Sequence, residues 1–291
     1  MDPVATNATA RVPPGRSFCL AGVMGWPVHH SRSPMIHHHW LQEYGWPGAY
    51  VPLPVEPARL REALTGMRAL GFAGCNLTLP HKVNALSLMD HVDPMARSIG
   101  AINTVVVQGD GALLGLNTDA FGFHESLRQS VSTWSADRGP AVVLGAGGAS
   151  RAVVASLLAH GCPEIRLLNR SLDRAQALAA DMPGPITTLP WSLRHDALGG
   201  ACLLVQTTSQ GMVGQGELDI ALHALPENAL VCDVVYTPLR TPLLRQAQER
   251  GLTTVDGLGM LLHQARAAFA AWFGVMPTAS TALREAVERT L

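Results

Sequence analysis

The chain has 291 residues, of which 47% are hydrophobic and 15% are charged, and its formal net charge is -1. Such a composition supports a large buried core and excludes intrinsic disorder, and the absence of a basic tract excludes a nucleic-acid-binding surface. The length predicts two domains or one large one. No apolar run reaches the roughly 18 residues of a membrane span, and residues 1–15 have no signal-peptide core, so a loose N-terminal tail is expected there.

The five cysteines are scattered along the chain and include no C-x-x-C pair. An odd number without a regular spacing is typical of reduced thiols rather than of a disulfide framework, which predicts a cytoplasmic protein. The cysteines are Cys19, Cys75, Cys162, Cys202 and Cys232.

Residues 17–23 form a short apolar run that predicts a buried strand, and the following Gly-Trp-Pro at 25–27 predicts a turn. The next loop leads into a helix for which Ser33 is the expected N-cap and Pro34 the first helical residue. The hydroxyls of Ser31 and Ser33 could bind a polyhydroxylated or carboxylated ligand. Capping alone would account for Ser33 but would leave Ser31 without a role.

Three consecutive histidines at 37–39 suggest a metal site at first sight. Successive residues on a helix point about 100° apart, so the three side chains cannot converge on one ion. The pattern therefore favours a solvated helix face, and no metal site is expected.

Residues 49–55 predict a second strand, residues 56–70 an amphipathic helix and residues 72–79 a third strand. This alternation of strands and helices indicates a mainly parallel sheet. In open α/β sheets the ligand binds at the carboxyl ends of the strands. Thr78 and Lys82 fall at that end of the third strand.

Lys82 is the only lysine of the chain, since the other 20 of the 21 basic residues are arginines. The lysine amine can be tuned to give and take a proton, whereas arginine stays protonated at any working pH. Alternatively, a single lysine could be a chance remnant on a solvated face. Its place at a strand end favours a functional role.

Residues 104–108 and 112–115 predict a β pair joined by the turn residues 109–111. Asp119 follows this pair and precedes a helical stretch at 120–134. Its carboxylate could be a helix N-cap, or it could hold and polarise Lys82 from another strand end.

After a polar linker at 135–140, residues 141–144 form a buried strand followed by a glycine-rich turn and an apolar helix that ends near Gly161. This strand, turn and helix carry the dinucleotide-binding fingerprint, with Ser150 at the position of the third glycine. Glycines let the backbone approach a pyrophosphate, which sits at the helix N-terminus. The residues expected to contact it are Gly145, Ala146, Gly147, Gly148 and Ala149.

The strand at 164–168 indicates which dinucleotide binds. NAD-binding units place an acidic residue near the end of this strand to hold the ribose 2′-hydroxyl. Here the strand is followed by Asn169, Arg170, Ser171, Leu172, Asp173 and Arg174. The two guanidinium groups suit a 2′-phosphate, so NADP is favoured, although Asp173 keeps NAD open.

Further strands are expected at 185–189, within 198–208, at 230–236 and at 253–255, with a helix at 242–251. Helices beginning near residues 256 and 278 have no sheet of their own, so we expect them to pack on the N-terminal domain. The predicted fold is α/β, with a mainly parallel substrate domain (16–119 with 256–291), a Rossmann-type nucleotide domain (120–255) and a cleft between them.

Taken together, the motifs resemble those of the shikimate dehydrogenase family over most of the chain, from Gly25 to about Ala265. The matching stretches are Gly25-x-Pro27, Ser31-x-Ser33-Pro34, Asn76-x-Thr78-x-Pro80-x-Lys82, Gly100-Ala101-x-Asn103-Thr104, Asn117-Thr118-Asp119-x-x-Gly122, Gly145-Ala146-Gly147-Gly148-Ala149, Asn169-Arg170-Ser171, and Asp256-Gly257-x-Gly259-Met260 with Gln264. So many motifs in order and well spaced are highly specific together.

The resemblance implies the NADP-linked interconversion of 3-dehydroshikimate and shikimate in aromatic biosynthesis, with a small-molecule substrate and a homodimer as the family-level assembly. Lys82 would transfer the proton, with Asp119 beside it. The substrate would be held by Ser31, Ser33, Thr78, Lys82, Asn103, Asp119, Tyr236 and Gln264. Val234 and Gly257 would lie near the nicotinamide.

Three positions depart from the family pattern. Gln206 stands where Asn is common, Ser171 replaces the more frequent Thr, and His81 occupies a place that is often apolar or aromatic. None removes a group that the chemistry needs.

Two alternatives follow from the same residues. A broader enzyme would also oxidise quinate, which differs from shikimate by one ring hydroxyl. A catalytically silent NADP-binding regulator would share the fold, because doubly wound sheets host many functions. The intact Lys82 and Asp119 argue against the second alternative.

Overall fold

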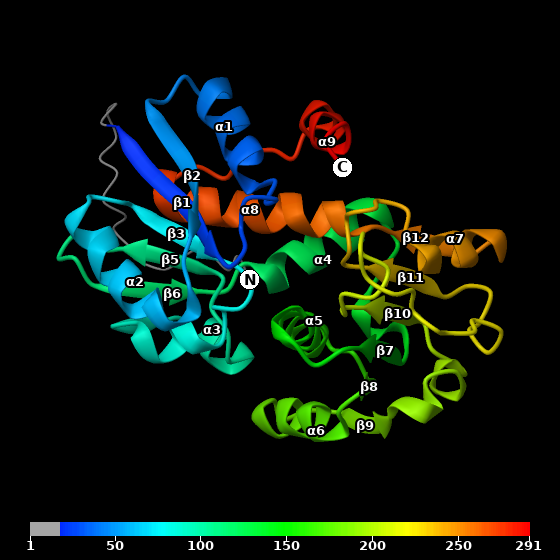
Figure 1. Ribbon diagram of the computed structural model, residues 1–291. Coiled ribbons are helices and arrows are strands. Elements are labelled where there is room, and N and C mark those ends of the chain that lie inside the picture. Colours follow the sequence, from blue (N-terminus) through cyan, green and yellow to red (C-terminus); the bar gives the residue numbers. More distant parts are fainter. Residues whose placement is uncertain (1–17) are drawn as a thin grey trace. The chain divides into compact units, whose positions relative to one another are not determined.

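The computed structural model describes residues 18–291, so the expected tail at 1–15 lies outside the described residues. The chain forms two compact units (Figure 1). The first runs to Phe121 and also takes up Leu262–Thr290, and the second is Gly122–Leu261. The chain passes from one unit to the other inside α4 (Asp119–Ser130) and again inside α8 (Gly257–Phe273), and not at the polar segment 135–140.

The first unit contains a six-stranded sheet in the order β2-β1-β3-β5-β6-β4. β1 pairs in parallel with β2 and β3, whereas β5 is antiparallel to both β3 and β6. The expected β pair is therefore present. The strands are β1 (Cys19–Gly25), β2 (Gly48–Pro54), β3 (Gly74–Leu77), β4 (His91–Val92), β5 (Thr104–Val107) and β6 (Leu113–Leu116).

One face of this sheet is covered by α2 (Leu60–Ala69) and α3 (Pro94–Ile99). Leu60, Leu64 and Met67 recur at the spacing of one helix face, and all three are buried in the cluster beneath α2. That cluster continues through Cys75 and Leu77 of β3.

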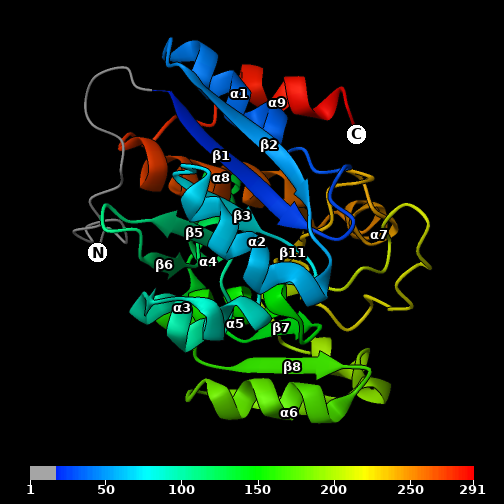
Figure 2. The same ribbon diagram turned by 60° about the vertical axis from the view of Figure 1, so that its left-hand side comes forward.

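On α1 (Ser33–Glu43), Trp40 donates its indole N–H to Thr278 O at 3.0 Å. From α8, Trp272 donates to Val105 O at 3.0 Å, and it passes so close to Gly74 that a Cβ there would lie 2.4 Å from Trp272 Nε1. α9 (Thr281–Glu288) lies beside α1 (Figures 1 and 2). The expectation that the last two helices pack on the first unit is confirmed.

The histidine run at 37–39 does not lie on a solvated face, so that expectation is wrong for His37. His37 is fully buried and shares the inward face of α1 with Ile36 and Trp40. Its ring stacks on Tyr50 with a centroid separation of 4.0 Å, and burial lowers its pKa to about 3. The reason is that Phe269 and Trp272 of α8 pack on His37 and cover a face of α1 that would otherwise be exposed to solvent.

The second unit contains a six-stranded parallel sheet in the order β12-β11-β10-β7-β8-β9. The order along the sheet reverses between β7 and β10, which marks the ligand-binding switch point of a Rossmann-type sheet. The strands are β7 (Ala141–Leu144), β8 (Ile165–Asn169), β9 (Ile186–Pro190), β10 (Leu203–Gln206), β11 (Leu230–Asp233) and β12 (Thr253–Val255). Its helices include α5 (Gly148–Ala159), α6 (Leu172–Asp181) and α7 (Pro242–Glu249).

The core strands β7, β10 and β11 are buried along their whole length. α7 packs on one side of them through Leu243, Leu244 and Ala247. Between residues 18 and 291 no helix is long and apolar enough to cross a bilayer.

Candidate active site

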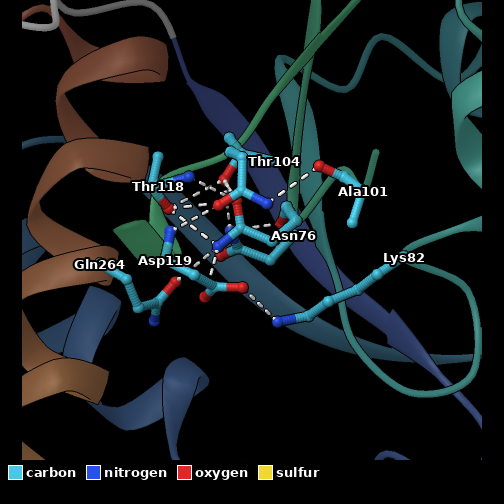
Figure 3. A network of polar contacts seen from close by, with 9 residues as sticks. Asn76, Lys82, Ala101, Thr104, Thr118, Asp119 and Gln264 are labelled. Carbon is cyan, nitrogen blue, oxygen red and sulfur yellow. Dashed lines mark hydrogen bonds and ion pairs between the residues drawn. The ribbon is translucent and has the colours of Figure 1, made fainter. Parts of the chain in front are cut away.

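Lys82 lies in the first unit, five residues after the end of β3. Its backbone is fixed by a hydrogen bond from Ile102 N to Lys82 O at 2.8 Å. Its side chain is 19% exposed, and its Nζ lies 2.5 Å from Asp119 Oδ2 (Figure 3). The amine is therefore held by a carboxylate while still reaching solvent.

Asp119 is the first residue of α4, and its side chain is only 6% exposed. Its Oδ1 accepts a hydrogen bond from Asn103 Nδ2 at 2.8 Å, and its Oδ2 faces the lysine. Of the two interpretations of Asp119, the structure therefore supports contact with Lys82, since both carboxylate oxygens contact side chains from other loops.

Asn103 immediately precedes β5, and fixed neighbours set the direction of its amide. Its Oδ1 accepts from Thr118 N at 2.8 Å and from Thr104 Oγ1 at 3.0 Å. A backbone N–H can only donate, so Oδ1 must face it and Nδ2 must face Asp119. Gln264 Oε1, from α8, lies 3.5 Å from the same Nδ2 (Figure 3).

Asn76 belongs to one of the matching motifs, but it is not among the site residues predicted from the sequence. Asn76 is buried in β3, and its Nδ2 donates to Asn103 O and to Thr104 Oγ1, both at 3.0 Å. Tyr50, which no sequence motif predicted, donates its hydroxyl to Asn76 Oδ1 at 2.6 Å. A buried asparagine inside an apolar strand was the available signal, because such an amide needs partners.

The two serines of the loop before α1 have different surroundings. Ser31 Oγ is partly exposed and accepts from Ser33 N at 3.3 Å, so Ser31 is the residue that contacts the start of the helix. The expected N-cap at Ser33 is wrong, since Arg32 occupies that position without a side-chain cap. Ser33 is buried instead and hydrogen-bonds the Tyr50 phenol.

Thr78 follows β3 directly and is partly exposed. Its N–H donates to Met24 O at 2.9 Å. A Cβ at Gly25 would lie 2.4 Å from the Thr78 methyl group, which explains why the strand ends in glycine there. His81 is buried and donates Nε2–H to Val55 O at 2.9 Å, so this departure from the family pattern has a structural role.

Tyr236 belongs to the second unit, in the loop after β11. Asp233 shapes this loop, because its two oxygens accept from Val235 N at 3.0 Å and from Thr241 Oγ1 at 2.7 Å. Burial raises the pKa of the Asp233 carboxyl to about 6, against the lowering effect of those two hydrogen bonds.

The glycine-rich turn follows β7 in the second unit, as the fingerprint predicts. Gly145 has φ +117°, and a Cβ there would lie 2.4 Å from Thr207 Oγ1. Ser150, at the position of the third glycine, donates to Gly145 O and closes the turn. Gly147 is exposed, and a Cβ on it would meet nothing within 4 Å, so the protein's own packing does not require glycine there. The site fits a dinucleotide, whose pyrophosphate would need that space.

The segment after β8 is open to solvent. Asn169 Nδ2 donates to Ser171 O at 2.8 Å and holds the turn into α6. Arg170, Asp173 and Arg174 are exposed, and no partner in residues 18–291 forms an ion pair with either guanidinium. Both cations are therefore available to a phosphate.

Val234 and Gly257, which were expected near the nicotinamide, lie against each other. A Cβ at Gly257 would lie 2.2 Å from Val234 O, so only glycine allows α8 to start there. Gln206 is buried at the end of β10 and bonds Thr208 N and Thr208 Oγ1 at 2.9 Å each, which fixes the loop that follows.

A lysine amine held by a buried carboxylate, together with a Rossmann-type unit bearing a glycine turn and exposed arginines, defines a dinucleotide-dependent dehydrogenase. Three family models match the chain: the shikimate dehydrogenase substrate-binding domain over residues 23–105, shikimate/quinate 5-dehydrogenase over 127–237, and the shikimate 5′-dehydrogenase C-terminal domain over 257–288. A shikimate dehydrogenase (NADP(+)) of Rhodospirillum rubrum is 59% identical over 272 residues, which cover 92% of this chain and 96% of that protein. The chain belongs to the shikimate dehydrogenase family.

The fold also matches solved structures of dehydrogenases. Shikimate 5-dehydrogenase of Thermus thermophilus, in complex with NADP(H) and shikimate, is 38% identical with a TM-score of 0.84, covering 94% of this chain and all of that one. Quinate dehydrogenase of Corynebacterium glutamicum, in complex with NAD, is 30% identical with a TM-score of 0.87 over the same shares.

Proposed function

We propose that Lys82 is the proton-transfer residue, and Asp119 its orienting partner, in an NADP-dependent shikimate dehydrogenase. The family of the chain supports the reversible reduction of 3-dehydroshikimate to shikimate. The observation that carries the residue roles is the 2.5 Å contact between Lys82 Nζ and Asp119 Oδ2, on an amine that still reaches solvent.

NADP, held by the second unit, would supply the redox chemistry by exchanging a hydride with the substrate. In the oxidising direction, the proton of the reacting hydroxyl must leave at the same time, and Lys82 accepts it. Asp119 keeps the lysine amine in place, since its other oxygen is anchored by Asn103. In the reducing direction the ammonium of Lys82 returns the proton to the carbonyl oxygen.

The substrate would bind through hydroxyl and amide groups already placed in the fold. Ser31 and Ser33 are proposed to bind the carboxylate, and Ser31 has the exposure that this needs. The ring hydroxyls would be held by Thr78, Asn103, Asp119, Tyr236 and Gln264, of which Asn103, Asp119 and Gln264 are linked in one buried network.

NADP would bind to the second unit. The turn from Gly145 to Ala149 would take the pyrophosphate, and Arg170 and Arg174 would take the 2′-phosphate of the ribose. Both guanidinium groups are exposed and form no ion pair within residues 18–291, which supports this assignment.

A second candidate is an enzyme that also oxidises quinate, which the likeness to the Corynebacterium quinate dehydrogenase favours. Steady-state kinetics with shikimate and quinate, each with NADP and NAD, separate the two. We expect the highest kcat/KM with shikimate and NADP. A comparable value with quinate would establish the broader enzyme, and tight NADP binding without turnover would establish a silent regulator.

We also infer that the protein works in the cytoplasm, which is supported by its five free cysteines. The homodimer that the family resemblance implies is tested by light scattering coupled to size-exclusion chromatography.

A further inference from the structure

Tyr50 lies in the middle of β2 and is completely buried in the first unit. Its hydroxyl contacts two residues from different segments, Asn76 of β3 at 2.6 Å and Ser33 at the start of α1. Burial raises the pKa of the phenol far above its ordinary value, so the hydroxyl keeps its proton. Tyr50 therefore joins a proposed substrate-binding serine to the polar interior beneath the proposed catalytic pair.

The hydrogen bond from Tyr50 to Asn76 can run in only one direction. Asn103 O is a backbone carbonyl and can only accept, so the side of Asn76 that faces it must be Nδ2. Asn76 Oδ1 then faces Tyr50, and the phenol must donate to it. Without that hydroxyl, the buried Asn76 Oδ1 would lose its donor. Leaving a buried acceptor without a partner costs more free energy than removing both partners of a hydrogen bond.

The hydrogen bonds continue in one direction from Asn76 to the Lys82–Asp119 pair. Asn76 Nδ2 also donates to Thr104 Oγ1 at 3.0 Å, so the threonine hydroxyl is free to donate to Asn103 Oδ1 at 3.0 Å. With Oδ1 occupied, Asn103 Nδ2 points to Asp119 Oδ1 at 2.8 Å. Asp119 Oδ2 then remains for Lys82. Figure 3 shows this series of hydrogen bonds from Asn76 to Lys82.

The ring of Tyr50 is fixed as firmly as its hydroxyl. It stacks on His37 with an interplanar angle of 4°, and Trp272 packs against it with a centroid separation of 5.9 Å. A phenylalanine at this position would keep that stacking and lose only the hydroxyl.

We propose that Tyr50 is a positioning residue for the Lys82–Asp119 pair, acting through Asn76, Thr104 and Asn103. This inference rests on the proposed roles of Lys82 and Asp119. Tyr50 itself would contact neither the substrate nor the cofactor. Backbone groups set which way the two buried amides face, and the Tyr50 hydroxyl holds the Asn76 amide in place, so that Asp119 presents one oxygen to the lysine amine.

The test is Tyr50→Phe, with Tyr44→Phe as the matched control. Tyr44 belongs to the same aromatic layer, packing on Trp46 and Phe269, but within residues 18–291 its hydroxyl has no hydrogen-bond partner. We expect Tyr50→Phe to lower kcat about tenfold, since small misplacements of catalytic groups cost up to about 100-fold. The Kd for NADP should stay unchanged, and Tyr44→Phe should keep the wild-type kcat.

A double-mutant cycle with Asn103→Ala separates positioning from general destabilisation. If Tyr50 acts through Asn103, adding Tyr50→Phe to Asn103→Ala lowers kcat no further. Losses that multiply would overturn the proposal. Thr104→Val removes the hydroxyl that links Asn76 to Asn103 and changes the side-chain volume little. A wild-type kcat in a folded Thr104→Val protein would also overturn the proposal. This test remains valid even if Tyr50→Phe folds poorly.

The single lysine provides a spectroscopic readout. Protein labelled with 13C-lysine gives one lysine signal, from Lys82, and we expect its 13Cε shift to move in Tyr50→Phe and to stay in place in Tyr44→Phe. An unmoved signal would overturn the positioning role. The proposed function is tested separately by Lys82→Ala: if that variant turns over normally while Tyr50→Phe moves the lysine signal, the catalytic assignment fails and the structural coupling stands.

Discussion

Lys82 Nζ lies 2.5 Å from Asp119 Oδ2, although the two residues are 37 positions apart in the chain. Lys82 follows β3 and Asp119 follows β6, and these two strands lie on either side of β5 in the sheet. The pairing of β5 with both neighbours therefore sets the distance between the amine and the carboxylate.

Replacing Lys82 by alanine removes the proposed proton acceptor. We expect kcat to fall by at least about 100-fold, the low end of general acid–base effects, with substrate and NADP affinity little changed. Lys82→Arg keeps the charge but cannot release a proton, so it should be as inactive as Lys82→Ala. Stopped-flow and steady-state assays measure both variants, and near-normal turnover in either would exclude Lys82 from proton transfer.

Replacing Arg170 and Arg174 by alanine removes the two exposed cations after β8. We expect the Kd for NADP to rise roughly tenfold for each change, because charge-assisted bonds to phosphate are lost, while the Kd for NAD stays constant. Arg59→Ala is the control, since Arg59 is an exposed arginine of the first unit that pairs with Glu62. Equal weakening of NADP and NAD would contradict a 2′-phosphate contact. Calorimetry with both nucleotides makes the comparison.

Asp233 makes stability depend on pH in a predictable direction. Its folded-state pKa is raised from 3.8 to about 6, so its contribution to stability is present below about pH 4 and is lost as the pH rises through about 6. The loss is on the order of 3 kcal/mol. Urea unfolding from pH 4 to 8 measures the free energy of unfolding. We expect it to decline with rising pH in the wild-type protein and to lack this decline in Asp233→Asn.

The exposed carboxylate Asp219 supplies the control for that experiment. Asp219→Asn should keep the wild-type dependence of the unfolding free energy on pH. A wild-type dependence in Asp233→Asn as well would show that another group is responsible.

Trp272→Phe tests how the first unit depends on α8. The change removes the hydrogen bond from the indole to Val105 O and leaves a small void. We expect the unfolding free energy to fall by about 1–3 kcal/mol. Trp26→Phe, at a 47% exposed side chain, should change it by less than about 0.5 kcal/mol. Equal effects of the two changes would contradict this dependence.

The parts of the fold that were predictable from the sequence are those with local signals. The residues of β7 and β12 and the glycine turn after β7 were predicted correctly because a short apolar run and its flanking glycines define them without reference to distant residues. Lys82 could be found in the same way, from its rarity and its place after a strand.

Other features depend on contacts between distant segments. The roles of Asn76 and Thr104 follow from their direct pairing between β3 and β5, and no local pattern reveals that register. The burial of His37 follows from α8, which is far away in the sequence and covers the helix face that carries it. Periodicity alone cannot predict which face a distant helix will cover.

The division of the chain into units has a consequence for synthesis on the ribosome. Domains generally fold as units while the chain emerges, and the second unit is continuous from Gly122 to Leu261. The sheet of the first unit is translated earlier, but its packing is completed only by Trp272 of α8 and by α9. The first unit is thus the last to be completed, and until α8 is made the rings of His37 and Tyr50 lack the cover that Phe269 and Trp272 give them.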